Sequence, residues 1–472
     1  MLTYAFEKTM GESLYEQLYR HIKEEILAGH LASGEKLPSK RTLAQHLKIS
    51  VITVKNAYEQ LMAEGYIYAQ EKKGYYVNYV EGLPGNKLPP PPEEPVKPLS
   101  HRAYFMDFVT NSISAEDFPF TVWSRMMRET ISEEGKKLLA PMAYNGAPEL
   151  RGAIARYLYQ FRGMRVDPEQ IVVGAGTEFL YNLIIQLLGR DKCYAVEDPG
   201  YGKIGKIYES NQVALRRVGL DKNGLSVQEL RRCGADVVHI SPSHHYPTGI
   251  VMPIGRRQEL LRWAGQERYI LEDDYDSEFR FVGRPIQTLF SIDENRRVIY
   301  LNTFSKTIAP SIRISYMILP PPLLLAYREK LRFYACTVPS FEQYTLARFM
   351  ERGSYEMHIN RMKNRYHQKR DAVIADIRRS AFAGHVQILE EDAGLHFLMH
   401  IDTELLDGEL RRRAAAQGVR LALLSDYYSR PETARPHVMV VNYSGIDLDR
   451  LPEALRRLAS AFEMEEGGTS HV

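Results

Sequence analysis

The sequence predicts an α/β protein in which a small domain of three helices and a strand pair precedes a large domain with a mainly parallel sheet. The 472 residues exceed what one core usually serves, and short apolar runs alternate with helical patterns in the second part. Between them, the proline-dense LPGNKLPPPPEEPVKP can neither bury a core nor donate many backbone hydrogen bonds, which favours an extended linker. The expected parts are the small domain at 1–80, the linker at 81–101, the large domain at 102–466 and a tail at 467–472.

Composition favours a cytoplasmic protein. The cysteines, Cys193, Cys233 and Cys336, are odd in number and far apart, which indicates a reducing compartment without a disulfide framework. Charges interrupt every apolar stretch of the N-terminus, and no later run approaches the roughly 18 apolar residues of a spanning helix, so we expect neither secretion nor membrane insertion. The formal net charge is only +2, but five basic residues and no acidic one lie between Glu35 and Glu59.

The small domain is predicted to contain three helices and a hairpin. Apolar residues recur every four positions over 14–27, which indicates one helical stripe. Ser39 and Ser50 stand at the N-cap positions of a second and a third helix, because serine accepts hydrogen bonds from the free amides of a first turn. The third helix is expected to end near Glu64. YIYAQEKKGYYVNYV then alternates around EKKG, which predicts a strand pair with a basic turn.

Two capped helices joined by a short turn can place the second helix in a major groove of DNA. Arg41, Lys55, Lys72 and Lys73 would then contact phosphates, while Thr53 could reach a base edge. The alternative is a protein-interaction module whose basic residues form a solvated face.

The segment LPSKRTLAQHLKISVITVKNAYEQLMAEGYIYAQEKKGYYV resembles the GntR-type winged helix, whose pattern is LPSxRxLAxxLxVSRxTVxxAYxxLxxEGxxxxxxGxGxxV. The resemblance implies a winged helix-turn-helix domain that binds a double-stranded DNA operator. Val51 replaces the usual arginine, so it could contact a thymine methyl group or could mean one phosphate or guanine contact fewer. The first wing glycine is also replaced. The expected DNA-binding residues are Ser39, Arg41, Thr53, Lys55, Lys72, Lys73 and Gly74.

In the large domain, polar residues gather where strands are expected to end, which is where open α/β sheets bind ligands. QIVVGAGTEFLYNLIIQLL predicts a strand, a turn and a helix, so the amides of Ala175, Gly176 and Thr177 could cradle a phosphate. In ADVVHISPSHHYPTG, the expected strand is followed by two adjacent histidines, His244 and His245. No third ligand lies nearby at helical spacing, so we expect no metal there. The acidic cluster in LEDDYDSEF would suit magnesium or an organic cation equally.

The segment RVIYLNTFSKTIAPSIRISYMILP favours the organic cation. Lys306 at a strand end can condense with an aldehyde, although a lone Ser-Lys pair is more often a surface feature. Thr303, Ser305 and Arg313 offer hydroxyl groups and a bidentate cation for a phosphate. A protonated pyridine nitrogen needs a buried carboxylate, which Asp273 supplies at another strand end. Together these features predict a pyridine cofactor that bears an aldehyde and a phosphate.

Residues 103–463 resemble fold-type-I aminotransferases, which implies pyridoxal 5'-phosphate as the cofactor. The motifs that carry this resemblance are YNGAPELRGAIARYL, EDPGY, PTG and the lysine segment. By this resemblance the cofactor-binding residues are Lys306 for the Schiff base, Asp273 and Tyr275 for the ring nitrogen and phenolic oxygen, Arg313 with Ala175, Gly176, Thr177, Thr303 and Ser305 for the phosphate, Tyr201 for stacking on the ring, and Tyr144 for the phosphate of the other subunit.

Two departures from the aminotransferase pattern affect the expected contacts to the cofactor and to the substrate. Asparagine usually precedes PTG, where this chain has Tyr246, so the contact to the phenolic oxygen must be reassigned. The late strand usually carries an arginine for the substrate carboxylate, and HVMVVNYSG has none. Lys203, Arg430 and Arg435 are therefore the candidates to bind an effector carboxylate.

The order of winged helix, proline-rich linker and aminotransferase-like domain resembles the MocR subgroup of bacterial regulators. The resemblance implies a head-to-tail homodimer whose large domain senses pyridoxal phosphate, or an amino compound that forms an aldimine with it, without physiological turnover. The alternative is a working aminotransferase that carries a DNA-binding domain, and the missing late arginine favours the sensor. A regulator that has lost its cofactor is disfavoured because Lys306, Asp273 and Arg313 are all present.

Overall fold

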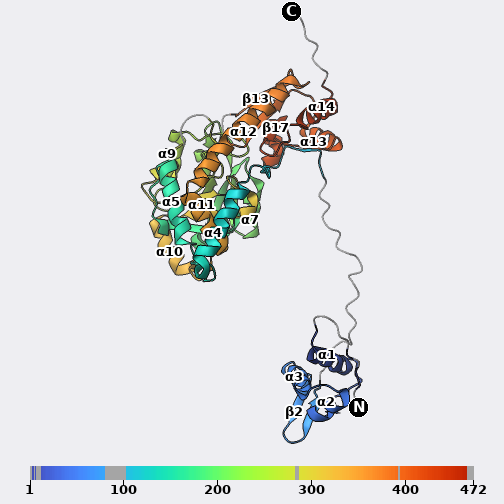
Figure 1. Ribbon diagram of the computed structural model, residues 1–472. Helices are drawn as coiled ribbons and strands as arrows, with labels where there is room; N and C mark the ends of the chain where they lie inside the picture. Colours follow the sequence, from blue (N-terminus) through green and yellow to red (C-terminus); the bar gives the residue numbers. More distant parts are fainter. Residues whose placement is uncertain are drawn as a thin grey trace, which may run out of the picture. The chain divides into compact units, whose positions relative to one another are not determined.

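The computed structural model describes residues 3–4, 6, 12–79, 103–281, 286–391 and 394–464. The chain divides into two compact units, residues 1–102 and 103–472, drawn in blue and in cyan to red in Figure 1. The expected linker at 81–101 and the tail at 467–472 lie outside the described residues. None of the helices in the described segments is both long and apolar enough to cross a lipid bilayer.

The small unit consists of three helices and a three-stranded antiparallel sheet, in which the predicted strand pair is joined by a short further strand that was not predicted. Its elements are α1 (Leu14–Leu27), β1 (Lys36–Leu37), α2 (Lys40–Leu47), α3 (Val51–Ala63), β2 (Ile67–Gln70) and β3 (Gly74–Val77). Strand β3 lies between β1 and β2 and pairs antiparallel with both. The apolar stripes of the three helices meet in one core, in which Leu18, Leu43 and Tyr58 are fully buried. The Tyr58 hydroxyl group donates to the carbonyl oxygen of Pro38 at 3.0 Å, which ties α3 to the segment before α2.

The large unit is built on an eight-stranded sheet with the order β5-β12-β11-β10-β9-β6-β7-β8. Its strands are β5 (Ile171–Gly174), β6 (Cys193–Asp198), β7 (Ala214–Asp221), β8 (Gly224–Leu225), β9 (Val237–Ile240), β10 (Tyr269–Asp273), β11 (Val298–Thr303) and β12 (Ser315–Ile318). Strands β11, β10, β9, β6 and β7 are mutually parallel, whereas β12 runs antiparallel between β11 and β5 and β8 antiparallel to β7. The predicted, mainly parallel sheet is confirmed.

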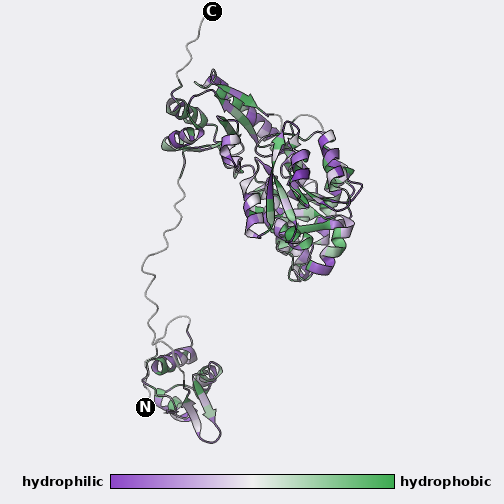
Figure 2. Ribbon diagram, turned by 180° about the vertical axis from the view of Figure 1, so that it is seen from behind, coloured by the Kyte–Doolittle hydropathy of each residue, from purple (hydrophilic) through white to green (hydrophobic). Residues whose placement is uncertain are grey.

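Helices cover both faces of this sheet. They are α4 (Phe120–Leu138), α5 (Pro148–Arg162), α6 (Thr177–Leu188), α7 (Gly202–Ser210), α8 (Val227–Arg232), α9 (Ile254–Ala264), α10 (Pro321–Leu331) and α11 (Ser340–Glu351). Alternate strand residues face opposite layers: Val173 packs in a cluster with α4, α5 and α11, and Val172 in a cluster with α6 and α10. Figure 2 shows green, hydrophobic residues along the strands of this sheet.

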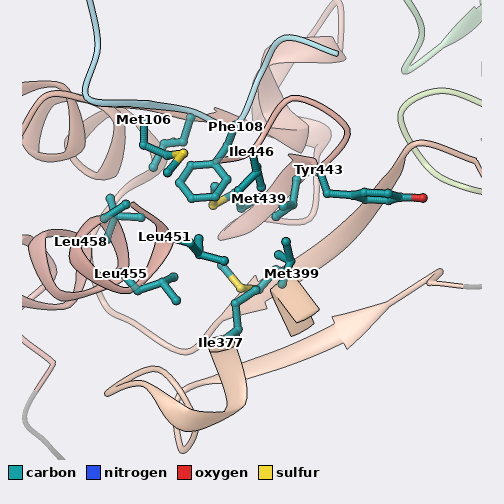
Figure 3. Packing of buried hydrophobic residues seen from close by; sticks show 14 of the residues in the cluster. Met106, Phe108, Ile377, Met399, Met439, Tyr443, Ile446, Leu451, Leu455 and Leu458 are labelled. Atoms are coloured by element: carbon teal, nitrogen blue, oxygen red, sulfur yellow. The ribbon is translucent and has the colours of Figure 1, made fainter. Parts of the chain in front are cut away.

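A second sheet follows the long helix α12 (Ser354–Arg379). The remaining elements are β4 (Met106–Asp107), β13 (Val386–Leu389), β14 (His396–Ile401), α13 (Asp407–Ala416), β15 (Val419–Arg420), β16 (Ala422–Leu423), β17 (Val438–Asn442) and α14 (Leu451–Ala461). Strands β13, β14, β17 and β16 form an antiparallel sheet, and β4 pairs with β15. Figure 3 shows Met106 and Phe108, from the start of the unit, packed beside Leu451 and Leu458 of α14. The first residues of the large unit thus stabilise its last helix.

Candidate functional site

In the small unit, two serine caps hold the turn between α2 and α3. The Ser39 hydroxyl group accepts a hydrogen bond from the Thr42 amide at 3.2 Å, and the Ser50 hydroxyl group accepts one from the Thr53 amide at 3.0 Å. The Thr53 hydroxyl group is also hydrogen-bonded to that of Ser50 at 2.8 Å, and the Thr53 residue is half-buried. Ser39 and Thr53 therefore place their hydroxyl groups in helix caps.

The predicted basic contacts lie on the exposed side of the same unit. The side chains of Arg41, Lys55, Lys72 and Lys73 are exposed. Lys55 Nζ lies 3.6 Å from a carboxylate oxygen of Glu59, an exposed pair that holds the ammonium group only weakly. The two hairpin lysines belong to the turn between β2 and β3, and Gly74 is the first residue of β3; Lys72 and Gly74 have positive φ angles of 60° and 118°.

The outer face of α3 carries further residues that the prediction of DNA contacts did not name. Ile52 is 69% exposed and Asn56 is also exposed, whereas Val54 and Tyr58 on the opposite face are fully buried. A helical repeat of 3.6 residues places positions 52 and 56 together on the outer face. The spacing of four residues between Ile52 and Asn56 is visible in the sequence. The predicted phosphate contacts were chosen by positive charge, so neither residue was among them.

In the large unit, the turn between β5 and α6 forms a backbone concavity. Gly176, the N-cap of α6, has a φ of 92°, and a Cβ atom added there would lie 2.0 Å from Nη2 of Arg313. Glycine is therefore required both by the backbone conformation and by the arginine above it. The Ala175 amide donates to the Thr337 hydroxyl oxygen at 3.0 Å, so this amide already has a partner. The amides at the start of α6 and the nearby Arg313 are groups that could donate hydrogen bonds to an anion.

Glu178, in the first turn of α6, forms ion pairs with two cations beside this backbone concavity. One carboxylate oxygen accepts from Arg313 Nη2 at 2.5 Å, and the other forms an ion pair with Lys203. Burial alone would raise the pKa of Glu178, but the hydrogen bonds from Lys203 and Arg313 outweigh it and lower the pKa. This glutamate was not predicted, because its partners lie far from it in the sequence. Arg313 immediately precedes β12, and Lys203 lies on α7.

Lys306 and Ser305 follow the end of β11. Burial lowers the pKa of the Lys306 amine, and the charge of Asp276 partly opposes this effect. The buried Ser305 Oγ has no hydrogen-bond partner within the described segments. The neighbouring Thr303 is different, because its hydroxyl oxygen accepts from the Ser305 amide at 3.1 Å and from the Ser315 hydroxyl group at 2.8 Å. Thr303 thus organises the loop, while Ser305 offers the free hydroxyl group.

Asp273 ends β10 and is only 6% exposed. Its Oδ2 accepts from the Tyr181 hydroxyl group at 2.5 Å and lies 3.5 Å from Nε2 of His239. Burial and the charge of Asp273 raise the pKa of Tyr181 well above its ordinary value, so the phenol keeps its proton and donates a hydrogen bond to the carboxylate. In the described part of the chain, Asp273 Oδ1 is buried without a hydrogen-bond partner. A buried carboxylate with one free oxygen is suited to a cationic N–H donor.

Tyr275 and Tyr246, whose predicted roles concern the phenolic oxygen of the cofactor, are hydrogen-bonded to other residues of the chain. The Tyr275 hydroxyl group donates to the carbonyl oxygen of His244 at 3.0 Å, and His244 Nδ1 lies 2.9 Å from Asp276. Tyr246, which replaces the usual asparagine, is hydrogen-bonded through its hydroxyl group to that of Tyr427 at 2.7 Å. Tyr201 is 51% exposed, and its ring lies 6.2 Å from that of Tyr246 in an edge-on arrangement.

Two carboxylates of the acidic cluster at the end of β10, those of Glu272 and Asp274, are hydrogen-bonded to residues outside the cluster. Glu272 accepts from the Leu289 and Phe290 amides, and Asp274 accepts from Arg162 and from the Tyr300 hydroxyl group. Among the residues that the structure describes, no group of three or more His, Cys, Asp or Glu side chains could hold a metal ion. These carboxylates therefore belong to buried hydrogen-bond networks that support the strand end.

The remaining predicted site residues are dispersed. Lys203 is close to the start of α6, because it forms an ion pair with Glu178. Arg430 and Arg435 are exposed on the loop before β17. That loop reaches the large sheet, because the Ser429 amide donates to Asp198 at 2.9 Å. The Tyr144 hydroxyl group accepts from Arg328 Nε at 3.0 Å within the same chain.

Together, these residues of the large unit fit a phosphate-bearing pyridine aldehyde. Arg313, Ser305 and the α6 amides supply donors for a phosphate, the free Asp273 oxygen supplies an acceptor for a ring N–H, and Lys306 supplies an amine. Strands β10 and β11 are parallel neighbours, so Asp273 and the segment of Lys306 come from the same edge of the sheet.

Two family models match the chain. Residues 14–77 match the gntR family of bacterial regulatory proteins, and residues 105–458 match aminotransferase class I and II. The second match alone covers most of the chain and coincides with the large unit.

Several relatives match over nearly the whole chain. YdeL, an uncharacterized HTH-type transcriptional regulator of Bacillus subtilis (strain 168), is 36% identical over 98% of this chain and 100% of its own length. The probable rhizopine catabolism regulatory protein MocR of Rhizobium meliloti is 30% identical over 95% of this chain and 94% of its own. Among solved structures, the kynurenine aminotransferase of Pyrococcus horikoshii in complex with PMP matches with a TM-score of 0.66 and 23% identity, over 77% of this chain and 91% of that chain. The last likeness concerns the fold.

Proposed function

Because the chain belongs to the MocR-type regulators of the gntR family, we propose that it is a DNA-binding transcriptional regulator whose large unit binds pyridoxal 5'-phosphate. The regulator responds to this cofactor, or to an amino compound that reacts with it. The observation that carries the proposal is the pair of strand ends at β10 and β11. The first offers a buried Asp273 oxygen that has no hydrogen-bond partner among the described residues, and the loop after the second offers the amine of Lys306, whose pKa is lowered by burial.

Each part of the cofactor has a holder in this proposal. Asp273, oriented by Tyr181, holds the ring nitrogen. Arg313, Ser305 and the amides at the start of α6 hold the phosphate. When bound, pyridoxal phosphate supplies an aldehyde that reacts reversibly with amines. Because burial lowers the pKa of Lys306, more of its amine is neutral and able to react at a given pH than for an exposed lysine.

The altered surroundings of the site support sensing over turnover. Tyr246 and Tyr427 hold each other through their hydroxyl groups, and Asn442 Nδ2 lies 3.4 Å from the Tyr246 oxygen. Lys203 is the proposed partner of an effector carboxylate, with Arg430 and Arg435 on the loop before β17 as further candidates. An effector shifts the regulator only if it binds one arrangement of the domains more tightly than another.

The proposal includes the assembly and location expected from the family. A head-to-tail homodimer would bring Tyr144 to the phosphate of the other subunit, and the protein would act in the cytoplasm. The small and large domains span 1–80 and 102–466 in this proposal, with a linker at 81–101 and a tail at 467–472.

The test uses the full chain and duplexes that it selects from a pool of random sequence. Fluorescence anisotropy measures their Kd with and without saturating pyridoxal phosphate, and equilibrium dialysis measures cofactor binding. We expect cofactor binding and a change in Kd when the cofactor, or the cofactor with an amino acid, is added. A chain that binds no cofactor would contradict the proposal, and sustained turnover of amino acids with 2-oxoglutarate would contradict a role limited to sensing.

A further inference from the structure

The first turn of α3 exposes two branched apolar side chains. Ile52 is 69% exposed and Val51 45% exposed, and both immediately follow the N-cap Ser50. They are not unfilled parts of the core, because Val54, Ala57, Tyr58 and Leu61 of the same helix are fully buried. Large apolar side chains on the outer face of a helix are unfavourable in water, so a partner that covers them gains free energy.

The surroundings of this apolar pair are basic. Lys55 lies one turn after Val51 on the outer face of α3, and Arg41 of α2 is exposed on the same helix-turn-helix. Between Glu35 and Glu59 the sequence contains no acidic residue. This distribution of charge suits a polyanion and disfavours an acidic or neutral protein surface as the occupant.

A helix that enters a major groove presents its N-terminal residues to the base edges. There, the apolar group that distinguishes one base is the C5-methyl group of thymine. Asn56 follows Ile52 by four residues on the outer face, and an asparagine amide can pair with N6 and N7 of adenine. Apolar and amide side chains on one face are therefore both suited to A·T pairs, and neither is suited to guanine.

We propose that Val51 and Ile52 read thymine methyl groups, so that the outer face of α3 selects A·T pairs in the operator. This inference rests on the proposed DNA-binding function and adds the base class that α3 recognises. It assigns a role to Ile52, and it decides between the two consequences of placing valine at position 51.

The experiment replaces thymine by uracil, which removes the methyl group and leaves base pairing intact. Duplexes are first selected from a random pool by the full chain, and each thymine of the selected site is then replaced in turn. We expect one or two positions at which uracil weakens binding about fourfold per methyl group. Ile52→Ala should weaken binding to the thymine duplex by a similar factor and leave binding to the matching uracil duplex unchanged. Leu14→Ala, which truncates a residue of α1 that is 45% exposed, is the matched control and should behave like the wild type.

The outcomes separate the inference from the function on which it rests. Unchanged affinity for every uracil duplex, or selected sites with G·C pairs where α3 protects the bases, would overturn the thymine assignment while the DNA-binding function stands. Failure to select any duplex above the binding level of random DNA would instead contradict the proposed function. Ile52→Ala must retain the salt-dependent binding to random DNA of the wild type, which shows that the small unit is folded.

Discussion

The two units place their functional side chains in opposite ways. In the small unit, Arg41, Lys55 and Ile52 are exposed and lie outside its core. In the large unit, Asp273 is buried at the end of β10, and Lys306 is half-buried in the loop that follows β11. Burying a polar group costs free energy unless it has a partner, so the large unit surrounds such groups with supporting tyrosines and histidines. The comparison predicts that function and stability can be changed separately in the small unit and are coupled in the large one.

The largest expected effect is that of Lys306→Ala. The variant should lose all covalent attachment of pyridoxal phosphate, because the amine of Lys306 is the group proposed to react with the aldehyde. Borohydride reduction followed by intact-mass measurement should add one cofactor to the wild type and none to the variant. Lys222→Ala, an exposed lysine between β7 and β8, is the control and should be labelled like the wild type. Equal labelling of Lys306→Ala would remove this lysine from the proposed site.

A second prediction concerns the cost of burial at Glu197, which lies on β6. Burial raises the pKa of Glu197 to about 8, and the charge of Asp273 adds to the effect. Below the ordinary value of 4.5, both the folded and the unfolded chain hold this proton, and the full contribution of Glu197 to stability is present. As the pH rises towards 8, only the folded chain keeps the proton, so stability falls.

Glu197→Gln removes this proton and keeps an oxygen for the Ser241 amide, which donates at 2.9 Å. Between pH 5 and pH 8, the free energy of unfolding of the wild type should fall by about 3 to 4 kcal/mol more than that of the variant. Urea unfolding of the full chain measures it, since both tryptophans, Trp123 and Trp263, lie in the large unit. Parallel pH profiles of the two proteins would show that Glu197 is ionised in the fold.

A third prediction concerns Tyr181, which supports Asp273 from α6. Tyr181→Phe removes the hydrogen bond of 2.5 Å to Asp273 and should weaken cofactor binding about fivefold, for a loss of about 1 kcal/mol. Tyr194→Phe removes a hydrogen bond of 2.9 Å to Gly189 and is the matched control. Both variants should lose similar stability in urea unfolding, and only Tyr181→Phe should raise the Kd of the cofactor in equilibrium dialysis. A similar Kd for both variants would break the link between Tyr181 and the site.

The sequence predicts local features of both units better than long-range ones. The caps at Ser39 and Ser50 involve residues three positions apart, so the helix-turn-helix follows from local rules. Lys306 and Asp273 were predicted because strand ends can be recognised one at a time. The Tyr181 and Asp273 contact joins residues 92 positions apart, and that of Tyr246 and Tyr427 joins residues 181 positions apart. Such pairs depend on the register in which helices and loops pack on the sheet, which local patterns do not determine.

The smallest effect on stability is expected at Lys55, and it tests the other half of the comparison. Lys55→Ala should weaken binding to all duplexes alike and reduce the slope of log K against log salt by about 1, because one phosphate contact is lost. Within the described residues, the exposed pair with Glu59 is the only ion pair of this ammonium group, so the free energy of unfolding should change by less than about 0.5 kcal/mol. Glu59→Gln removes the neighbouring negative charge and should strengthen binding slightly. A Lys55→Ala variant with an unchanged salt slope would place Lys55 away from the DNA backbone, and loss of stability would show that function and folding are coupled in the small unit as well.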